Sequence, residues 1–356
     1  MRYILVALAC SQLIAACKER AQTDDVVLVW DGSRATGVQI SAQLIDQTDE
    51  DVRSGVSVVV EGQDEDHGIL GQTSSEGHWI NFTPVVPFTN GMKYHVYNKG
   101  NLIATFTVPE SKEPAPVLSA IYPSADTVPE NLLKMYLQFS KPMQQGRSLS
   151  YISVLRNNLD TVTNTFLDLQ PELWNADGTM LTLWLDPGRI KRDLIPNKEL
   201  GNPLEAGGSY TMYISGDWKS TDGRKLPKSY SKSLTVSARD ENIPVPEQWT
   251  LKPPKAGTKD ALRVVFHEAL DYMLVMEAIQ IRDSGTAVSG TMSTINKELT
   301  ALFVPDEPWR TGVYHLSIES RLEDLAGNNL NRLFDRNIET DSASDKKTVT
   351  LSFSVN

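Results

Sequence analysis

The 356-residue sequence predicts an all-β protein built from antiparallel β-sandwich domains in tandem. Three observations predict this fold class. Short segments alternate strictly between apolar and polar residues, turn signals separate them at intervals of about ten residues, and one pattern occurs three times in the same order. No long helical periodicity follows the first sixteen residues, so helices are expected to contribute little.

The alternation is clearest at 133–139, where leucine, methionine and phenylalanine take every second position. Segments 180–185, 210–215 and 262–267 follow the same rule. A period of two with one apolar face indicates antiparallel strands that bury one side against a core. Dipeptides that favour tight turns separate such strands at Asn90-Gly91, Asp177-Gly178 and Asp222-Gly223.

The repeated pattern consists of an apolar residue two positions before a proline, then a second proline, a glycine turn, a strand with a tyrosine and a closing apolar strand. The second proline, the glycine and the tyrosine are Pro87, Gly91 and Tyr94, then Pro203, Gly207 and Tyr210, then Pro308, Gly312 and Tyr314. Repetition of one supersecondary unit predicts three related domains.

Breaks in composition give the expected boundaries. Residues 110–116 and 240–247 combine proline with charge and lack apolar periodicity, which is typical of short, semi-rigid linkers. We therefore expect a signal peptide at 1–16, a tether at 17–25, and domains at 26–109, 117–239 and 249–356. Fully extended, the tether spans about 30 Å, enough to clear lipid head groups.

The N-terminal segment carries Arg2 and interrupted apolar runs that are too short to span a bilayer as a stable helix. It ends in two alanines directly before Cys17. It resembles the lipobox of bacterial lipoproteins, in which small residues precede a cysteine that is acylated and becomes the mature N-terminus. The resemblance implies a lipid anchor at Cys17, and two or three acyl chains hold a protein firmly at a membrane. Cys10 is a less suitable second candidate, and an ordinary secretory signal with an incidental cysteine is the alternative.

The residue after Cys17 is Lys18. In lipoproteins of enteric type an aspartate at this position retains the protein at the inner membrane. The resemblance therefore implies an outer-membrane location in the cell envelope, and the membrane, reached through the lipid, is the first expected partner.

Composition excludes several classes of function. Cys10 and Cys17 are the only cysteines, so the folded part has no disulfide, thiolate metal site or cysteine nucleophile. The net charge is −11, and no basic cluster is evident, which argues against nucleic acid as a partner. No phosphate-binding loop, dinucleotide fingerprint or nucleophile elbow occurs, so we expect no cofactor and no catalytic residues.

Residues 128–143 contain an extended strand that ends in Phe139-Ser-Lys-Pro-Met143. This segment resembles the opening of bacterial Ig-like domains of the S-layer SbsA type. Residues 262–270 resemble it more weakly, with Leu270 at the place of the methionine, and Asp324-Leu-Ala-Gly-Asn328 resembles the family's D-x-x-G-N turn. The resemblance covers residues 117–356 and implies tandem immunoglobulin-like sandwiches. Such domains serve as stalks, spacers and binding modules, so the resemblance constrains fold more than function.

Metal sites have weak support in the sequence. The five histidines form no pair with metal-ligand spacing, and copper or zinc binding is not expected. Glu323, Asp324 and Asn328 offer two or three oxygens for calcium, but a turn held by its own Asp side chain explains them equally well. We therefore expect no metal.

The second domain carries the most distinctive sequence, a loop-rich insertion between Phe166 and Gly208. Long loops in small sandwiches are usually functional, or they cover an open sheet. Alternation places some aromatic residues away from the core, where they could stack on sugars or anchor a protein partner. The candidate ligand-binding residues are Trp184, Tyr136, Trp174 and Tyr213. The alternative is that Trp174, Trp184 and the loop form a secondary core.

Two further groups lie in the insertion. Its basic residues Arg189, Lys191 and Arg192 are expected to form a solvated loop. Its acidic residues could supply the paired carboxylates of a glycosidase, which must face one cleft; they are Asp168, Glu172, Asp177 and Asp186.

The sequence thus favours a non-catalytic, envelope-anchored lipoprotein that acts in adhesion, envelope structure or ligand presentation, with a glycan or an envelope protein as partner. The alternatives are a polysaccharide-handling accessory protein or enzyme, and a periplasmic metal-binding protein.

Overall fold

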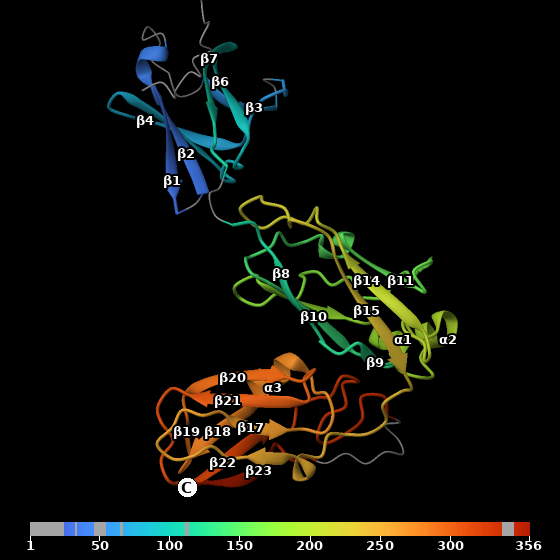
Figure 1. Cartoon of the computed structure of the whole chain (residues 1–356). Coiled ribbons are helices and arrows are strands. Elements are labelled where there is room, and N and C mark those ends of the chain that lie inside the picture. Colours follow the sequence, from blue (N-terminus) through green and yellow to red (C-terminus); the bar gives the residue numbers. More distant parts are fainter. Residues whose placement is uncertain (1–24, 33, 46–54, 65–66, 111–113, 337–344) are drawn as a thin grey trace, which may run out of the picture. The chain divides into compact units, whose positions relative to one another are not determined.

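The computed structural model describes residues 25–32, 34–45, 55–64, 67–110, 114–336 and 345–356 (Figure 1). Two compact units, residues 1–114 and 115–356, divide the chain. Strands dominate both units, and three separate hydrophobic cores lie between pairs of sheets. The chain is therefore all-β, with tandem Ig-like sandwiches, as the alternation predicts.

Domain 1 makes up the first unit and packs two antiparallel sheets around Val38, Ile40, Tyr94 and Phe106. Its four-stranded sheet has the order β1-β2-β5-β4, with β1 at Val26–Asp31, β2 at Arg34–Ser41, β5 at Trp79–Pro84 and β4 at Gly71–Glu76. Its three-stranded sheet has the order β3-β6-β7, with β3 at Val56–Val60, β6 at Lys93–Asn98 and β7 at Asn101–Thr107.

Domain 2 opens the second unit and contains the insertion. One sheet has the order β13-β10-β8, with β13 at Met180–Trp184, β10 at Lys134–Phe139 and β8 at Leu118–Tyr122. The other has the order β12-β11-β14-β15-β9, with β12 at Asp160–Thr161, β11 at Ile152–Arg156, β14 at Ser209–Ile214, β15 at Tyr230–Ser237 and β9 at Thr127–Pro129. Two short helices, α1 at Pro187–Ile190 and α2 at Ile195–Leu200, lie in the insertion.

One pairing in domain 2 departs from the expected antiparallel sheet. β9 runs parallel to β15, with Val128 opposite Val236. The chain leaves β8 in one sheet and continues as β9 in the other, so β9 enters beside the last strand in the same direction.

Domain 3 completes the second unit. One sheet has the order β16-β17-β21-β20, with β16 at Thr250–Lys252, β17 at Leu262–Val265, β21 at Thr300–Pro305 and β20 at Gly290–Ile295. The other has the order β19-β18-β22-β23, with β19 at Thr286–Ala287, β18 at Ile279–Asp283, β22 at Gly312–Glu319 and β23 at Thr348–Val355. Helix α3, Tyr272–Ala278, precedes β18.

The tyrosine of the repeated pattern has the same role in all three domains. Its hydroxyl accepts a hydrogen bond from the backbone N–H two residues after the repeat proline. The three bonds are Thr89 to Tyr94 at 2.8 Å, Glu205 to Tyr210 at 3.0 Å and Arg310 to Tyr314 at 3.1 Å. This geometry is the tyrosine corner of immunoglobulin-like sandwiches.

The two segments that resemble the SbsA-type opening also occupy corresponding positions. Met143 and Leu270 are both fully buried. Met143 forms an isolated bridge with Ser220, beside the turn at Asp222, and Leu270 forms one with Asp324. A shared sequence pattern therefore corresponds to a shared local structure, although the sequence of the third domain has diverged.

The expected signal peptide and lipid anchor at Cys17 lie outside the described residues. Within the described part of the chain, no helix has the length and apolar character needed to cross a bilayer.

Candidate functional site

Domains 2 and 3 meet in an extensive contact, which we name the joint. The rings of Tyr122 and Tyr272 stack with centroids 3.6 Å apart and planes 8° apart. Beside them, Ser124 donates from its N–H and its hydroxyl to the buried Glu298 carboxylate, each at 2.7 Å. Domain 3 therefore holds both the end of β8, at Tyr122, and the segment that follows it, at Ser124.

The outer face of β10 forms the centre of the joint. The Tyr136 hydroxyl donates to both carboxylate oxygens of Asp271, at 2.8 and 2.7 Å. Lys134 Nζ lies 3.3 Å from Asp271 and 2.7 Å from Glu323. Burial alone would lower the pKa of Lys134, but the two carboxylates raise it, so the ammonium stays charged. Burial and the Asp271 charge raise the pKa of Tyr136, so its hydroxyl stays a donor.

The D-x-x-G-N turn of domain 3 packs directly on domain 2. The Leu133 N–H donates to the Leu325 carbonyl at 2.9 Å. Gly327 has a φ of +78°, and a Cβ there would lie 2.3 Å from the Leu133 side chain. Glycine is therefore required twice, by backbone conformation and by the close approach of domain 2.

The linker at Asp240 is held from both sides. Its carbonyl accepts from Asn131 Nδ2 of domain 2 at 2.9 Å and from Asn328 Nδ2 of domain 3 at 3.3 Å. Asn328 also donates to Asp324 at 2.9 Å and accepts from the Phe334 N–H at 3.0 Å. One asparagine therefore connects the linker, the turn and the loop that follows it.

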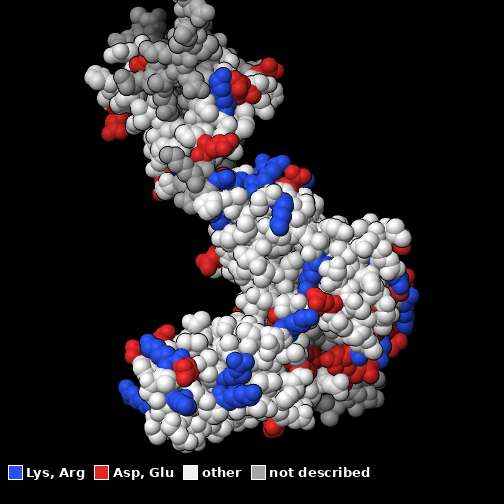
Figure 2. Space-filling view, in the orientation of Figure 1, with Lys and Arg blue, Asp and Glu red and all other residues white. Residues whose placement is uncertain are grey.

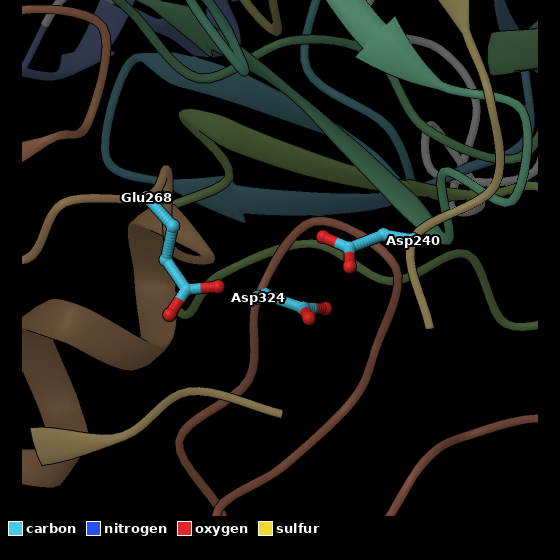
Figure 3. A group of neighbouring side chains, drawn as sticks. All are labelled: Asp240, Glu268 and Asp324. Atoms are coloured by element: carbon cyan, nitrogen blue, oxygen red, sulfur yellow. The ribbon is translucent and has the colours of Figure 1, made fainter. Parts of the chain in front are cut away.

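Three carboxylates converge at this point: Asp240, Glu268 and Asp324 (Figure 3). Figure 3 shows Asp324 between the other two, which come from the linker and from the segment after β17. Their nearest oxygens all lie within 4.8 Å of one another. Among the described residues, no basic side chain forms an ion pair with any of these three. We name this group the carboxylate cluster.

Like charges in a buried site disfavour ionisation. Burial, followed by the charge of Asp240, raises the pKa of Glu268 to about 7. Burial also raises the pKa of Asp324 to about 8, despite its hydrogen bonds from Ala326 and Asn328. Asp324 is only 2% exposed. At neutral pH the carboxylate cluster is therefore expected to hold at least one proton.

A hard cation would be the alternative to a proton. Ca²⁺ needs about six to eight oxygen ligands. The cluster offers three carboxylates, but the oxygens of Asp324 already accept bonds from the Ala326 and Asn328 backbones and from the Asn328 amide. The arrangement therefore fits a shared proton better than a complete calcium site.

A cavity of about 710 Å³ adjoins Glu268. His267 and Arg332 also line it. His267 has a φ of +70°, a left-handed conformation that is uncommon outside glycine, and its Nε2 lies 3.1 Å from the Thr250 hydroxyl. Strained residues and carboxylates with raised pKa values concentrate at functional sites.

Replacing Glu268 with glutamine should stabilise the protein at alkaline pH. The pKa of Glu268 is higher in the folded state than in the unfolded chain, so the native protein binds more protons and loses stability as pH rises between about 4.5 and 7. Glutamine removes this loss. We expect no gain at pH 5 and a gain of about 1–2 kcal/mol at pH 8.5, after allowance for partial exposure. Thermal unfolding of the wild type and the Glu268→Gln variant from pH 5 to pH 8.5 measures this difference in stability.

The matched control is Glu307→Gln, which removes an exposed carboxylate of domain 3 outside the cluster. It should change stability equally at both pH values. Calcium and a chelator should leave the wild-type unfolding temperature at pH 7 unchanged if protons alone occupy the cluster. An equal effect of Glu268→Gln at pH 5 and pH 8.5 would contradict proton sharing.

The structure does not bring the four predicted ligand-binding aromatics together. Tyr136 and Trp184 lie on the outer face of β10 and β13, as the alternation predicts, and Lys134 Nζ sits 5.3 Å from the Trp184 ring centroid. Tyr136, however, is 5% exposed and is bonded to Asp271, so the partner that it contacts is the next domain of the same chain. This corrects its assignment to a ligand surface.

The other two lie elsewhere. Trp174 packs against the domain 2 core, 6.0 Å from Trp218 between ring centroids, and donates to Glu172 at 2.9 Å. Trp184 also packs against this core, which agrees with the secondary-core alternative for both tryptophans. Tyr213 lies on β14 in the opposite sheet and is 38% exposed, so it alone of the four stays a candidate for an exposed contact.

Glu172 and Asp186 of the insertion have structural partners, and Asp177 is exposed. Glu172 accepts from the Gly146 N–H, the Ser148 N–H and hydroxyl, and Trp174. Burial would raise its pKa, but these bonds lower it. Asp186 caps α1 through the Gly188 N–H. Asp168 and Glu172 border a space of only about 20 Å³, too small for a sugar.

The expectation of a solvated basic loop is wrong for Arg189, which is 6% exposed. Its guanidinium donates to five backbone carbonyls, those of Thr163, Asn164, Leu200, Gly201 and Asn202. Burial lowers its pKa. Arg189 therefore organises the insertion from inside. Arg192 is exposed, but it pairs with Asp335 of domain 3 at 2.9 Å.

Sequence reasoning missed Asp240, Glu268 and Asp271. Asp271 had a local signal, because it precedes a helix and accepts from the Leu274 N–H as its N-cap. Asp240 and Glu268 had none, because the carboxylates that surround them are distant in the chain. The sequence offers Glu323, Asp324 and Asn328 as neighbouring oxygen donors, whereas the structure groups Asp324 with Asp240 and Glu268.

Comparisons with known proteins found only solved structures of low sequence identity and low TM-score. A scan of protein families and a search of curated proteins each found no match. The N-terminal part of the bacterial S-layer protein SbsC is 13% identical, with a TM-score of 0.22 over 68% of this chain and 44% of that one. This chain thus spans less than half of that structure. The FN1–FN3 domains of chicken CNTN1 are 11% identical, with a TM-score of 0.20, and the match covers 92% of this chain and 97% of that one.

SGBP-B of Bacteroides ovatus, solved with a mixed-linkage heptasaccharide, is 14% identical, with a TM-score of 0.18 over 86% of this chain and 62% of that one. At these TM-scores the likenesses carry no argument about the function of this chain.

Proposed function

We propose that this chain is a non-catalytic, lipid-anchored protein of the cell envelope, in which domains 2 and 3 form one rigid arm that presents binding surfaces. The observation that carries this proposal is the joint. Stacked tyrosines, a buried ion-pair network and a linker bonded from both sides connect the two domains. Linked domains are expected to move relative to each other unless their interface is extensive. The contacts of the joint oppose such motion.

The anchor is the second part of the proposal. It is supported by the lipobox-like segment before Cys17, and Lys18 supports the outer membrane. Cys17→Ala should abolish incorporation of labelled palmitate and move the protein from the membrane fraction to the soluble fraction. Cys10→Ala is the matched control and should be labelled normally. Equal labelling of both variants would rule out an anchor at Cys17.

Rigidity has its own test. Cysteines introduced at Leu159, 82% exposed in domain 2, and Val313, 56% exposed in domain 3, can carry spin labels in a chain whose Cys10 and Cys17 are replaced by alanine. A rigid arm predicts one narrow distance distribution between the labels. The distribution should broaden when Asp271→Ala is added, because this change removes the central contact of the joint. A broad distribution in the otherwise unchanged chain would overturn the arm.

A further inference from the structure

The joint borders a second cavity, of about 470 Å³ and partly open to solvent, which we name the basic cavity. Both domains line it. The insertion of domain 2 contributes Lys191 and Arg192, and the loop after β22 contributes Arg332 and Arg336. Two acidic residues, Glu323 and Asp335, also line it. Figure 2 shows charges of both signs gathered where domains 2 and 3 meet, while much of the visible face of domain 2 is uncharged.

The two acids of the basic cavity are already bound by cations. Asp335 accepts from Arg192 Nε at 2.9 Å and from Arg239 Nη2 at 3.2 Å. Glu323 is bound by Lys134 at 2.7 Å. Arg332 also attracts Glu323 through its charge, without an ion pair. The wall still carries more positive than negative side chains, Lys191, Arg192, Arg332 and Arg336 against Glu323 and Asp335.

Two cations of the cavity wall, one from each domain, form no ion pair with a described carboxylate. Lys191 Nζ lies 4.4 Å from the Phe334 ring centroid, and it forms no ion pair among the described residues. A ring covers one side of an ammonium group and leaves N–H donors available on the other. Arg332 is exposed and also forms no ion pair in the described part of the chain. It lines both the basic cavity and the neighbouring 710 Å³ cavity.

This excess is unusual for the chain, whose net charge is −11. Clefts lined by one sign of charge concentrate ions of the opposite sign, more so where apolar walls lower the local dielectric. Leu333 and Phe334 provide such walls. An arginine fork and a lysine ammonium that face one space are the pair of donors that proteins use for phosphate groups.

We propose that the basic cavity binds a phosphate-bearing ligand between Lys191 of domain 2 and Arg332 of domain 3. The inference rests on the proposed arm, because a fixed joint is what holds the two cations on one cavity. Bound phosphate would bridge the domains and stabilise the joint further. Its source is either a small soluble phosphate or the headgroup of an envelope lipid.

The test titrates the full chain with inorganic phosphate by calorimetry. Phosphate should bind, and it should raise the unfolding temperature of domains 2 and 3 without affecting domain 1. Lys191→Ala and Arg332→Ala should each weaken binding about tenfold, as expected for the loss of one charge-assisted hydrogen bond. Lys198→Ala and Arg263→Ala are the matched controls, because they remove exposed cations of the same domains outside the cavity, and they should bind as wild type.

A second titration uses short-chain phosphatidylglycerol below its micellar concentration. Tighter binding than inorganic phosphate identifies a lipid headgroup as the source, and equal binding identifies the phosphate group alone. Binding of either probe that is unchanged in the Lys191→Ala, Arg332→Ala double variant would overturn the site, as would no binding of either probe. Spin-label distances in that double variant should stay narrow, so a failed phosphate site is distinguishable from a flexible arm.

Discussion

Asp271→Ala is expected to lower the stability of domains 2 and 3 by about 3 kcal/mol, as found when one partner of a buried charge network is removed. The carboxylate is 4% exposed and receives four interactions, from Tyr136, Lys134 and the Leu274 N–H. Alanine leaves the buried Tyr136 hydroxyl without its Asp271 acceptor and removes the N-cap of α3. It also leaves the Lys134 ammonium with Glu323 as its one remaining carboxylate in the joint.

Calorimetry of the full chain measures this effect. For a unit of this size, the loss corresponds to a decrease of about 6–12 °C in unfolding temperature. Domain 1 supplies an internal reference, because it forms a separate compact unit and its transition should not move. If domains 2 and 3 unfold together in the wild type, the variant should also separate their transitions.

Two controls isolate the contribution of the charge. Asp271→Asn keeps an acceptor for Tyr136 and Leu274 and loses only the ion pair, so it should destabilise by less than alanine. Asp160→Ala removes an exposed aspartate of domain 2 and should cost less than about 0.5 kcal/mol. A loss for Asp271→Ala that is no larger than that for Asp160→Ala would show that the network does not stabilise the joint.

The strands and their faces could be predicted because alternation is a local property. Met135, Leu137 and Phe139 lie in the core, and Tyr136 points away from it, as the pattern at 133–139 requires. The three repeated segments with proline, glycine and tyrosine are also local in sequence, and the structure shows that they form tyrosine corners. Each of these features depends on residues that are close in sequence.

What covers an outward face is not local. Tyr136 and Asp271 are 135 residues apart, and Ser124 and Glu298 are 174 apart. An outward tyrosine looks the same in sequence whether it faces solvent, a ligand or another domain. The joint and the carboxylate cluster therefore appear only when domains 2 and 3 are placed together.

Charge is ambiguous in the same way. Arg189, Lys191 and Arg192 are near neighbours in sequence, yet one is buried among carbonyls, one lies on a phenylalanine ring and one bridges to domain 3. Composition cannot separate these environments, because each depends on which distant part of the chain the insertion contacts at that residue.

Arg189→Ala should therefore destabilise domain 2 by about 3–4 kcal/mol, because a buried guanidinium is lost and five carbonyls lose a charged donor at once. Arg189→Lys should recover only part of this loss, since an ammonium has three donors in place of the planar fork. Calorimetry and limited proteolysis of the insertion measure both. The matched control is Arg156→Ala, which breaks an exposed ion pair with Glu205 and should cost about 1 kcal/mol or less. Equal effects of the two alanine variants would mean that the insertion holds its shape without Arg189.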